Sequence, residues 1–454
     1  MDKKVIFQRL GIILAYPLAY TYVRLLMNFS EDFYIKATVG AGEFHYNIAY
    51  PIFALLFIVV NEIVRRGRRG ASENPTTATI FWYVITFLAG LTATVGSTEV
   101  MDDLELVSVF GMHLAAVYSV LVSNKILLGG KTSGFIPADL IHGFYVKSFA
   151  GFPNFIVDWK AFGKKKTEAL PGEAIAAEET APKKNHISAV LFVLIMGVLM
   201  IISLALMSSI DEDIARFLEN CFGDMAEYLR HLELEEIFVR GMVAIPVCFY
   251  LYGLMSRSAK SDGEREKRVA SWLTRVRGKG KTVSSTLVYI AAGIFVVGYI
   301  LFFIKRLAYM LGGFAGNVPD GMLVSHYARE GFFELVGIMA VNMCVYLAII
   351  MLGKTDEDGK FSVPSKILVT LLMIESIIFA VIAMSKLGLY YSIYGYTPKR
   401  ILAMWATLTL AFAALMTTIT VHRGKPHFRA GVIFASVSYI AICILSGVLV
   451  AIGA

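Results

Sequence analysis

Charged side chains inside an apolar stretch are the first residues in this sequence that could do chemistry. The stretch from Ser325 to Leu335 reads SHYAREGFFEL and opens an apolar segment long enough to cross a bilayer. It places Arg329 beside Glu330 and adds a second acid, Glu334, about one helical turn further along. Because an ionisable side chain inside a membrane is costly, such residues are default candidates for a functional site.

Two later segments bring more ionisable and aromatic side chains to the same depth. A helix expected at 366–388 has Glu375 near its middle, and the link that follows it reads LGLYYSIYGYTPKR. Consecutive spanning helices run in opposite directions, so all of these residues except Glu375 are expected near one membrane surface. The predicted polar cluster consists of Tyr327, Arg329, Glu330, Glu334, Glu375, Lys386, Tyr390, Tyr394 and Arg400.

Two interpretations of this cluster remain open. In the first, the tyrosines form an interfacial belt, and ion pairs of Glu334 with Lys386 or Arg400 fasten neighbouring helices. In the second, the cluster lines a pocket for a small ligand or lipid headgroup. Arg329 and Arg400 would then suit a phosphate or carboxylate, because a guanidinium forms paired hydrogen bonds with such groups. Glu375 distinguishes the two interpretations. Its expected position near the middle of a spanning helix requires an ion-pair partner, a cavity or protonation of the carboxylate.

A weaker acidic cluster lies earlier in the chain. Acids surround a short connection, and a histidine lies two turns into the next helix, a combination that can bind a cation or a proton. The cluster consists of Glu99, Asp102, Asp103, Glu105 and His113. Acids are also ordinary in an outer loop, and a lone helical histidine is more often a packing residue. We favour the packing interpretation here.

Signatures of common enzyme and metal sites are absent from the sequence. There is no HExxH, GxSxG or P-loop pattern. The four cysteines have neither the spacing of a metal site nor that of a disulfide framework. We therefore expect no metal and no cofactor. A catalytic function is disfavoured but stays open, because catalytic groups can assemble from distant helices.

The elements that must position these residues are membrane-spanning helices. Of the 454 residues, 57% are hydrophobic and 17% are charged, whereas soluble domains have roughly 45–50% and 25%. The apolar residues gather in blocks of about 20, which is the length that crosses a hydrocarbon core. The net charge of +7 does not indicate nucleic acid, because the basic residues lie in short loops beside these blocks.

The fold class expected is an all-α, polytopic membrane helix bundle. Eleven spanning helices are predicted near 6–27, 45–64, 79–96, 104–123, 187–208, 238–255, 284–304, 331–353, 366–388, 400–421 and 431–452. Lys and Arg concentrate in alternate connections and are absent from 97–103, which predicts that the N-terminus lies inside. Small residues four apart, such as Gly111 with Ala115 and Gly431 with Ala435, predict close helix contacts.

Two long connections divide the chain. Residues 138–166 mix aromatic residues with a basic end and are expected to lie at the inner membrane surface, and 167–185 have the composition of a tether. The expected parts are therefore 1–123, 124–186 and 187–454. Residues 209–237 carry an apolar stripe opposite acids, which predicts an amphipathic helix on the outer face.

Three stretches resemble signature stretches of one bacterial family of multi-pass membrane proteins. They are VAIPVCFYLYGLM (243–255), HYAREGFFEL (326–335) and GLYYSIYGYTPKRI (388–401). The family is designated a domain of unknown function, under the numbers four-one-five-three and four-one-seven-three. The matching positions are Pro246, Tyr250, Tyr252, Gly253, Tyr327, Ala328, Arg329, Gly331, Phe332, Phe333, Leu389, Tyr390, Tyr394, Gly395, Thr397 and Arg400.

The resemblance covers roughly residues 187–421, and the chain departs from it at Lys386 and Tyr396, where the family often has arginine and leucine. It implies a multi-pass protein of a bacterial cytoplasmic membrane and names no substrate.

The function expected first is that of a transporter or of a lipid- or small-ligand-handling protein. Its polar site would face outward between the helices at 331–353, 366–388 and 400–421. The alternative is a sensor or regulatory protein that acts through its amphipathic extramembrane segments, and a membrane-embedded enzyme comes third. The partners expected are membrane lipids, with anionic lipid at the basic inner loops, and a small-molecule or lipid ligand, but no nucleic acid. The sequence names no protein partner.

Overall fold

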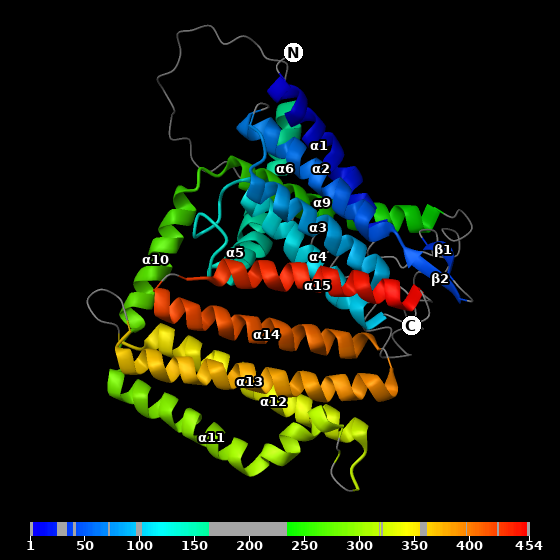
Figure 1. Cartoon of the computed structure of the whole chain (residues 1–454). Coiled ribbons are helices and arrows are strands. Elements are labelled where there is room, and N and C mark those ends of the chain that lie inside the picture. The colour runs from blue at the N-terminus through cyan, green and yellow to red at the C-terminus, as the bar shows by residue number, and fades with distance from the viewer. Residues whose placement is uncertain are drawn as a thin grey trace, which may run out of the picture. The chain divides into compact units, whose positions relative to one another are not determined.

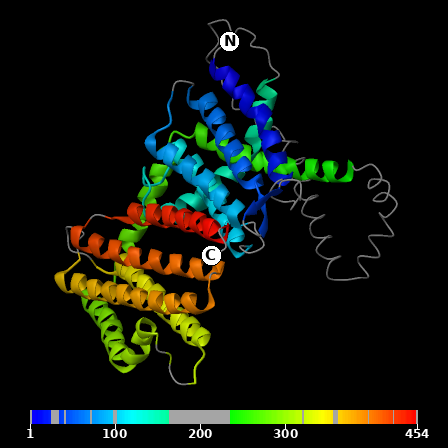
Figure 2. The same cartoon turned by 45° about the vertical axis from the view of Figure 1, so that its right-hand side comes forward.

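Helices make up almost all of the described chain (Figures 1 and 2). The computed structural model describes residues 3–24, 34–39, 42–70, 73–96, 102–162, 234–316, 318, 321–354, 361–395, 397–424 and 426–451. The protein divides into two compact units, each built from separate segments of the chain. The first unit comprises 1–30, 56–74 and 144–260, and the second comprises 31–55, 75–143 and 261–454.

Eight of the described helices are long and apolar enough to cross a membrane, which confirms that this is a helical membrane protein. They are α3 (Thr77–Gly96), α4 (Asp102–Ser123), α9 (Leu234–Lys260), α11 (Ser285–Ala315), α12 (Val324–Leu352), α13 (Val363–Tyr394), α14 (Pro398–Arg423) and α15 (Phe428–Ala451). A helix satisfies its own backbone hydrogen bonds, as a lipid environment requires.

The other three predicted spans have different outcomes. Helices α1 (Lys3–Tyr22) and α2 (Ala49–Arg69) form where two of them were predicted, but neither is among the eight membrane-span candidates. The predicted span at 187–208 lies outside the described residues, as does almost all of the amphipathic outer helix predicted at 209–237. The described chain therefore supports eight spans, and the total of eleven stays a prediction.

The all-α prediction misses one short hairpin. Strands β1 (Tyr34–Val39) and β2 (Gly42–Asn47) pair antiparallel, with Tyr34 opposite Asn47. Strand β2 includes residues 45–47, which were predicted to begin a helix. The hairpin forms for a local reason. Strand β1 is rich in the β-branched and aromatic residues that favour an extended backbone.

In the first unit, a glycine contact joins α9 to α6 (Ser148–Phe162). Two short elements precede α6 in the chain, α5 (Ile136–Ile141) in the second unit and the π-helical turn η3 (His142–Lys147). A Cβ added to Gly151 of α6 would lie only 2.2 Å from the carbonyl oxygen of Gly253 on α9. The hydroxyl of Tyr250 also donates to the carbonyl of Phe144, at 2.8 Å. The glycine crossing brings the backbones of α6 and α9 together, and the tyrosine joins α9 to η3.

In the second unit, α13 is the central helix. It packs against α11, α12 and α14, and α15 packs against α14 and α3 (Figures 1 and 2). Between α12 and α13, the amide of Asn342 donates to the hydroxyl of Ser376 at 2.8 Å in an otherwise apolar contact. Outward side chains such as Ile294 and Ile304 are apolar and exposed, as expected of a surface that meets lipid.

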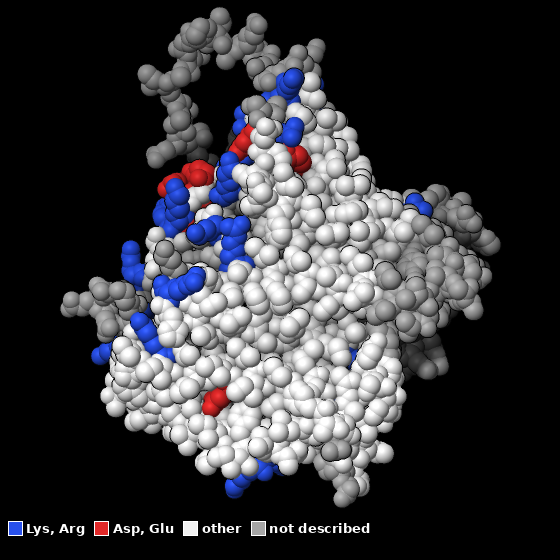
Figure 3. Space-filling view, in the orientation of Figure 1, with Lys and Arg blue, Asp and Glu red and all other residues white. Residues whose placement is uncertain are grey.

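The connection between α9 and α11 contains a charged helix that was not predicted. Helix α10 (Glu264–Gly280) runs across the direction of α11–α14 (Figure 1). On the face in Figure 3, the surface over α11–α15 is almost free of charge, and Lys and Arg gather toward the left, where Figure 1 places α10. This distribution is typical of an inner membrane surface.

The α6–α9 crossing predicts the effect of adding one methyl group. We expect Gly253→Ala to lower stability by about 1–3 kcal/mol, because its Cβ would lie 2.6 Å from the carbonyl oxygen of Ser148. The measurement is the melting temperature of the purified protein in detergent. Gly278→Ala on α10 is the matched control, because its Cβ meets nothing within 4 Å. Equal melting temperatures for the two variants would show that the crossing is not tight.

The expected topology predicts which residues a membrane-impermeant thiol reagent reaches. In a variant without native cysteines, we expect Leu323→Cys to be labelled in intact spheroplasts, because residue 323 is 71% exposed and precedes α12 at the end that this topology places outside. Asp262→Cys, just before α10, should be labelled only after the membrane is opened. The reverse pattern would contradict the expected orientation of α11 and α12.

Candidate ligand site around Lys386

A buried lysine lies at the centre of the predicted polar cluster. Lys386 of α13 is 1% exposed, which is rare for an ammonium group. Its Nζ lies 3.8 Å from the ring centroid of Tyr309 on α11 and 4.1 Å from that of Tyr327 on α12. The negative faces of the two rings attract the cation and offset part of its lost hydration. The charge therefore ties three helices together.

The two tyrosines hold each other in place. The hydroxyl of Tyr327 donates to the backbone carbonyl of Tyr309 at 2.5 Å, and the rings meet edge to face with centroids 5.0 Å apart. Tyr327 is completely buried. Its ring position is thus set by packing and by a hydrogen bond, which fixes the place of the cation.

Two glycines make room for the lysine side chain. A Cβ added to Gly331 of α12 would lie 2.2 Å from Nζ of Lys386, and one added to Gly313 of α11 would lie 3.2 Å from its Cγ. Tyr327 and Gly331 are both positions that the family resemblance singled out. The structure gives them one physical role, which is to accommodate the Lys386 side chain.

A small cavity borders the ammonium group. Its volume is about 10 Å³, which is roughly the space that one water molecule needs. Lys386, Glu334 of α12 and Arg306 of α11 all line it. The guanidinium of Arg306 also lies 5.3 Å from the centroid of the Tyr309 ring. Among the described residues, Glu334 is therefore a neighbour of Lys386, and no ion pair joins it to Arg400.

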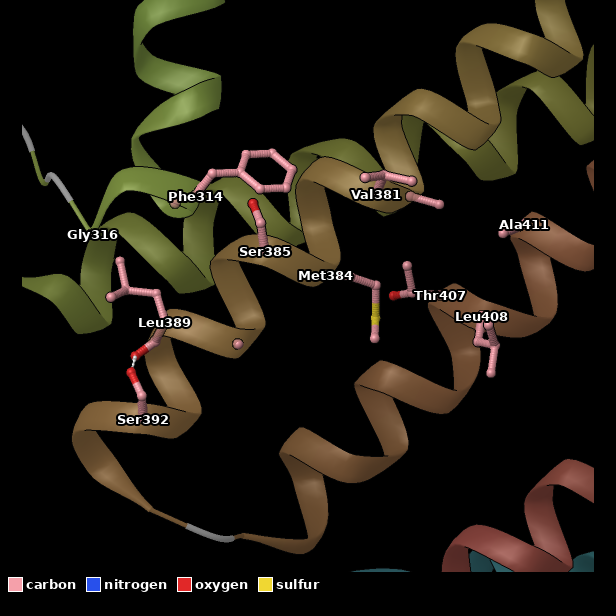
Figure 4. A pocket seen from close by; sticks show the side chains of 13 residues that line it. Phe314, Gly316, Val381, Met384, Ser385, Leu389, Ser392, Thr407, Leu408 and Ala411 are labelled. Atoms are coloured by element: carbon pink, nitrogen blue, oxygen red, sulfur yellow. Dashed lines mark hydrogen bonds between the residues drawn. The ribbon is translucent and has the colours of Figure 1, made fainter.

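A much larger apolar groove lies beside this cavity, between α11, α13 and α14 (Figure 4). It encloses about 700 Å³. Figure 4 shows Phe314 of α11 above α13, and Thr407 and Leu408 of α14 on the facing wall. Gly313, which contacts the Lys386 side chain, also lines the groove. The groove and the lysine therefore share a wall.

The hydroxyls in the groove have already used their donor hydrogens within the protein. Ser385 donates to the carbonyl of Ile382 at 2.8 Å, and Thr407 donates to that of Ala403 at the same distance. The third hydroxyl, from Ser392, is bonded to the backbone of its own helix in the same way. The space is therefore suited to hydrocarbon.

Arg400 fixes the turn between α13 and α14. Its Nη1 donates to the carbonyl of Tyr394 at 3.0 Å and to that of Gly395. Its guanidinium carbon lies 4.1 Å from the ring centroid of Tyr390 and 5.8 Å from that of Tyr394. Gly395 has a φ of +70°, a conformation that favours glycine.

The remaining residues of the predicted cluster lie apart from the lysine. Arg329 and Glu330 are exposed, and Glu330 pairs with His326 at 3.3 Å. Glu375 is 7% exposed, and its Oε2 has no hydrogen-bond partner among the described residues. Of the predicted set, the structure brings Tyr327, Glu334 and Lys386 together, groups Tyr390, Tyr394 and Arg400 at the turn, and leaves the other three elsewhere.

The weaker acidic cluster is only partly described. Glu99 lies outside the described residues, and of Asp102 and Asp103 the structure describes only that they begin α4. Glu105 accepts a hydrogen bond from the hydroxyl of Tyr50, and Nδ1 of His113 lies 2.7 Å from the carbonyl of Val109. Within the described ranges, no group of three His, Cys, Asp or Glu residues could hold a metal ion.

Sequence reasoning missed a buried acid in the first unit. Asp158 of α6 accepts hydrogen bonds from Tyr252 at 2.9 Å and from Lys260 at 3.2 Å, and it also pairs with Arg68. The available signal was a single acid in the apolar run NFIVDWK (154–160). Because three donors satisfy this carboxylate, its role is to fasten α2, α6 and α9.

Comparison with known proteins identifies one family. A family model described as Domain of unknown function (DUF4153) matches residues 84–450. The match extends beyond the range 187–421 that the resembling stretches covered, and it includes α3, α4 and α15. No curated protein and no solved structure matches the chain.

The lysine site predicts a strong coupling between two positions. We expect Gly331→Ala alone to cost about 1–3 kcal/mol, because the new methyl group would collide with the ammonium group. In a Lys386→Ala background, the same change should cost little. The melting temperatures in detergent of the unmodified protein, the two single variants and the double variant give the coupling free energy between positions 331 and 386. We expect this coupling at about 0.5–3 kcal/mol.

Gly337→Ala, on the same helix, is the control for this cycle, because its Cβ meets nothing within 4 Å. Additive effects of the changes at 331 and 386 would rule out the contact.

Proposed function

The chain belongs to the DUF4153 family of domains of unknown function, and we propose that it is a lipid-handling membrane protein that binds an anionic lipid at the Lys386 site. The hydrocarbon chain lies in the groove between α11, α13 and α14. The anionic headgroup lies among the basic residues at the same ends of these helices. The observation that carries the proposal is the wall that the apolar groove shares with Lys386.

The groove supports hydrocarbon over a polar solute. Its walls are side chains of three spanning helices, and the hydroxyls of Ser385, Ser392 and Thr407 are already bonded to their own backbones. A polar solute would find few free hydrogen-bond donors there, and burying its acceptor groups without donors is costly. An acyl chain has no such requirement.

The distribution of charge supports an anionic headgroup. Basic residues outnumber acids at the ends of α11–α14 that adjoin the groove. The basic residues are Lys305, Arg306, Arg329, Lys386, Lys399 and Arg400, and the acids in the described part of these ends are Glu330 and Glu334. In the expected topology these ends face outward, where Lys and Arg are normally depleted. A phosphate ligand accounts for the excess, because guanidinium and ammonium groups both bind phosphate.

Filling the groove tests the proposal. A Cβ on Gly388 meets nothing within 4 Å, so Gly388→Leu places its side chain in the groove without a backbone collision. We expect this variant to bind phosphatidylglycerol at least about tenfold more weakly than the unmodified protein, because the acyl chain loses its space. Binding is measured by native mass spectrometry in detergent, with phosphatidylcholine as the zwitterionic comparison.

Two further variants separate the contributions of the lipid's acyl chain and of its headgroup to binding. Gly298→Leu on α11 is the matched control, since residue 298 is exposed and its Cβ also meets nothing within 4 Å. Lys386→Gln should reduce the preference for phosphatidylglycerol over phosphatidylcholine. Unchanged phosphatidylglycerol binding by Gly388→Leu would refute the site.

A further inference from the structure

A second cavity lies on another face of α14. It encloses about 340 Å³ between α3, α4, α5, α14 and α15, all in the second unit. Trp405 of α14 lines this cavity, whereas Thr407, Leu408 and Ala411 of the same helix line the groove described above. The two spaces are therefore separate.

Small residues create this space. Gly111, Ala115 and Ala435 were predicted to bring helices into contact, but all three line the cavity. A Cβ on Gly111 meets nothing within 4 Å, so no neighbouring helix fills the space that the glycine leaves. The small side chains thus leave an opening between α4 and α15.

Fixed aromatic side chains form the walls. The rings of Trp82 and Tyr118 meet edge to face at 4.6 Å, and those of Trp405 and Tyr439 at 5.0 Å. Nε1 of Trp405 lies 3.2 Å from the carbonyl of Ala435, and the hydroxyl of Tyr439 lies 2.8 Å from that of Ser108. These hydrogen bonds keep the rings from closing the cavity.

Polar and charged side chains lie near one of the lining residues, Tyr118. Tyr118 lies close to Thr132 and within the electrostatic reach of Arg429 and Asp139. The carboxylate of Asp139 is 1% exposed, and one oxygen accepts the backbone N–H of Leu128 at 2.8 Å. The other oxygen has no hydrogen-bond partner among the described residues, and burial raises the pKa of Asp139 to about 6.

We propose that this cavity is a second lipid site, which takes the hydrocarbon chain of a membrane phospholipid with its phosphate near Arg429. Phe110 lines the cavity and is 63% exposed, so the space opens sideways toward the lipid that surrounds the spans. The volume falls at the lower end of the range for ligand sites, roughly 300–1,000 Å³. A helix with its side chains is about 10 Å across, so the cavity admits an acyl chain but not another helix.

Tryptophan fluorescence tests this inference, because two of the four tryptophans line the cavity. The reporter protein carries Trp159→Phe and Trp272→Phe and keeps Trp82 and Trp405. Phosphatidylglycerol with brominated acyl chains is titrated into this protein in detergent. We expect saturable quenching that Gly111→Leu reduces at least about fivefold, because leucine fills the cavity. Quenching that stays linear, or that is equal in Gly111→Leu, would overturn the proposal.

Matched variants separate this site from folding defects and from the groove. Gly298→Leu on α11 should leave quenching unchanged, as should Gly388→Leu, which fills the other site. If Gly111→Leu lowers the melting temperature, Ala435→Val provides an independent filling of the same cavity and should also reduce quenching. Arg429→Gln should weaken quenching by brominated phosphatidylglycerol more than by brominated phosphatidylcholine, and an equal effect on both would refute the headgroup position.

Discussion

The cation of Lys386 is the constraint on which the arrangement of α11, α12 and α13 depends. A buried ammonium must replace its lost hydration, and here the faces of Tyr309 and Tyr327 do so. That solution requires glycine at 331, because any side chain would occupy the position of the ammonium group. The groove lies beside this lysine, and Gly313 borders both.

The sequence identifies the charged residues of this site but not the groups that contact them. Apolar length indicates the spans, and the rule that intramembrane charge is costly selects Lys386 and Glu334. The actual partners of the cation are aromatic faces and a glycine, which helical spacing and charge pairing do not reveal. The resemblance marks Tyr327 and Gly331 as matching positions, but only the three-dimensional contact explains both.

Backbone contact sets a second limit on prediction. In the stretch at 243–255, Tyr252 and Gly253 hold α6 against α9 through a carboxylate and a glycine crossing, and Tyr250 bonds to a carbonyl of η3. Each partner lies about a hundred residues away, so no local pattern could identify it. The same reasoning applies to Gly111, because its spacing to Ala115 predicts a close helix contact, whereas its Cβ position meets nothing within 4 Å and the residue lines a cavity.

The continuity of α13 and α14 bears on the proposed lipid-handling function. Secondary carriers commonly bind solutes at breaks in their helices, where freed backbone groups coordinate the substrate. Here α13 runs unbroken for 32 residues and α14 for 26, and the prolines lie only in their first turns. Their backbone groups are consumed within the helices, and the groove hydroxyls are likewise bonded to the backbone. The surfaces that remain for a ligand are apolar walls with cations at their edges. Such surfaces suit an amphiphile, and they support the proposed lipid binding over carriage of a polar solute through the bundle.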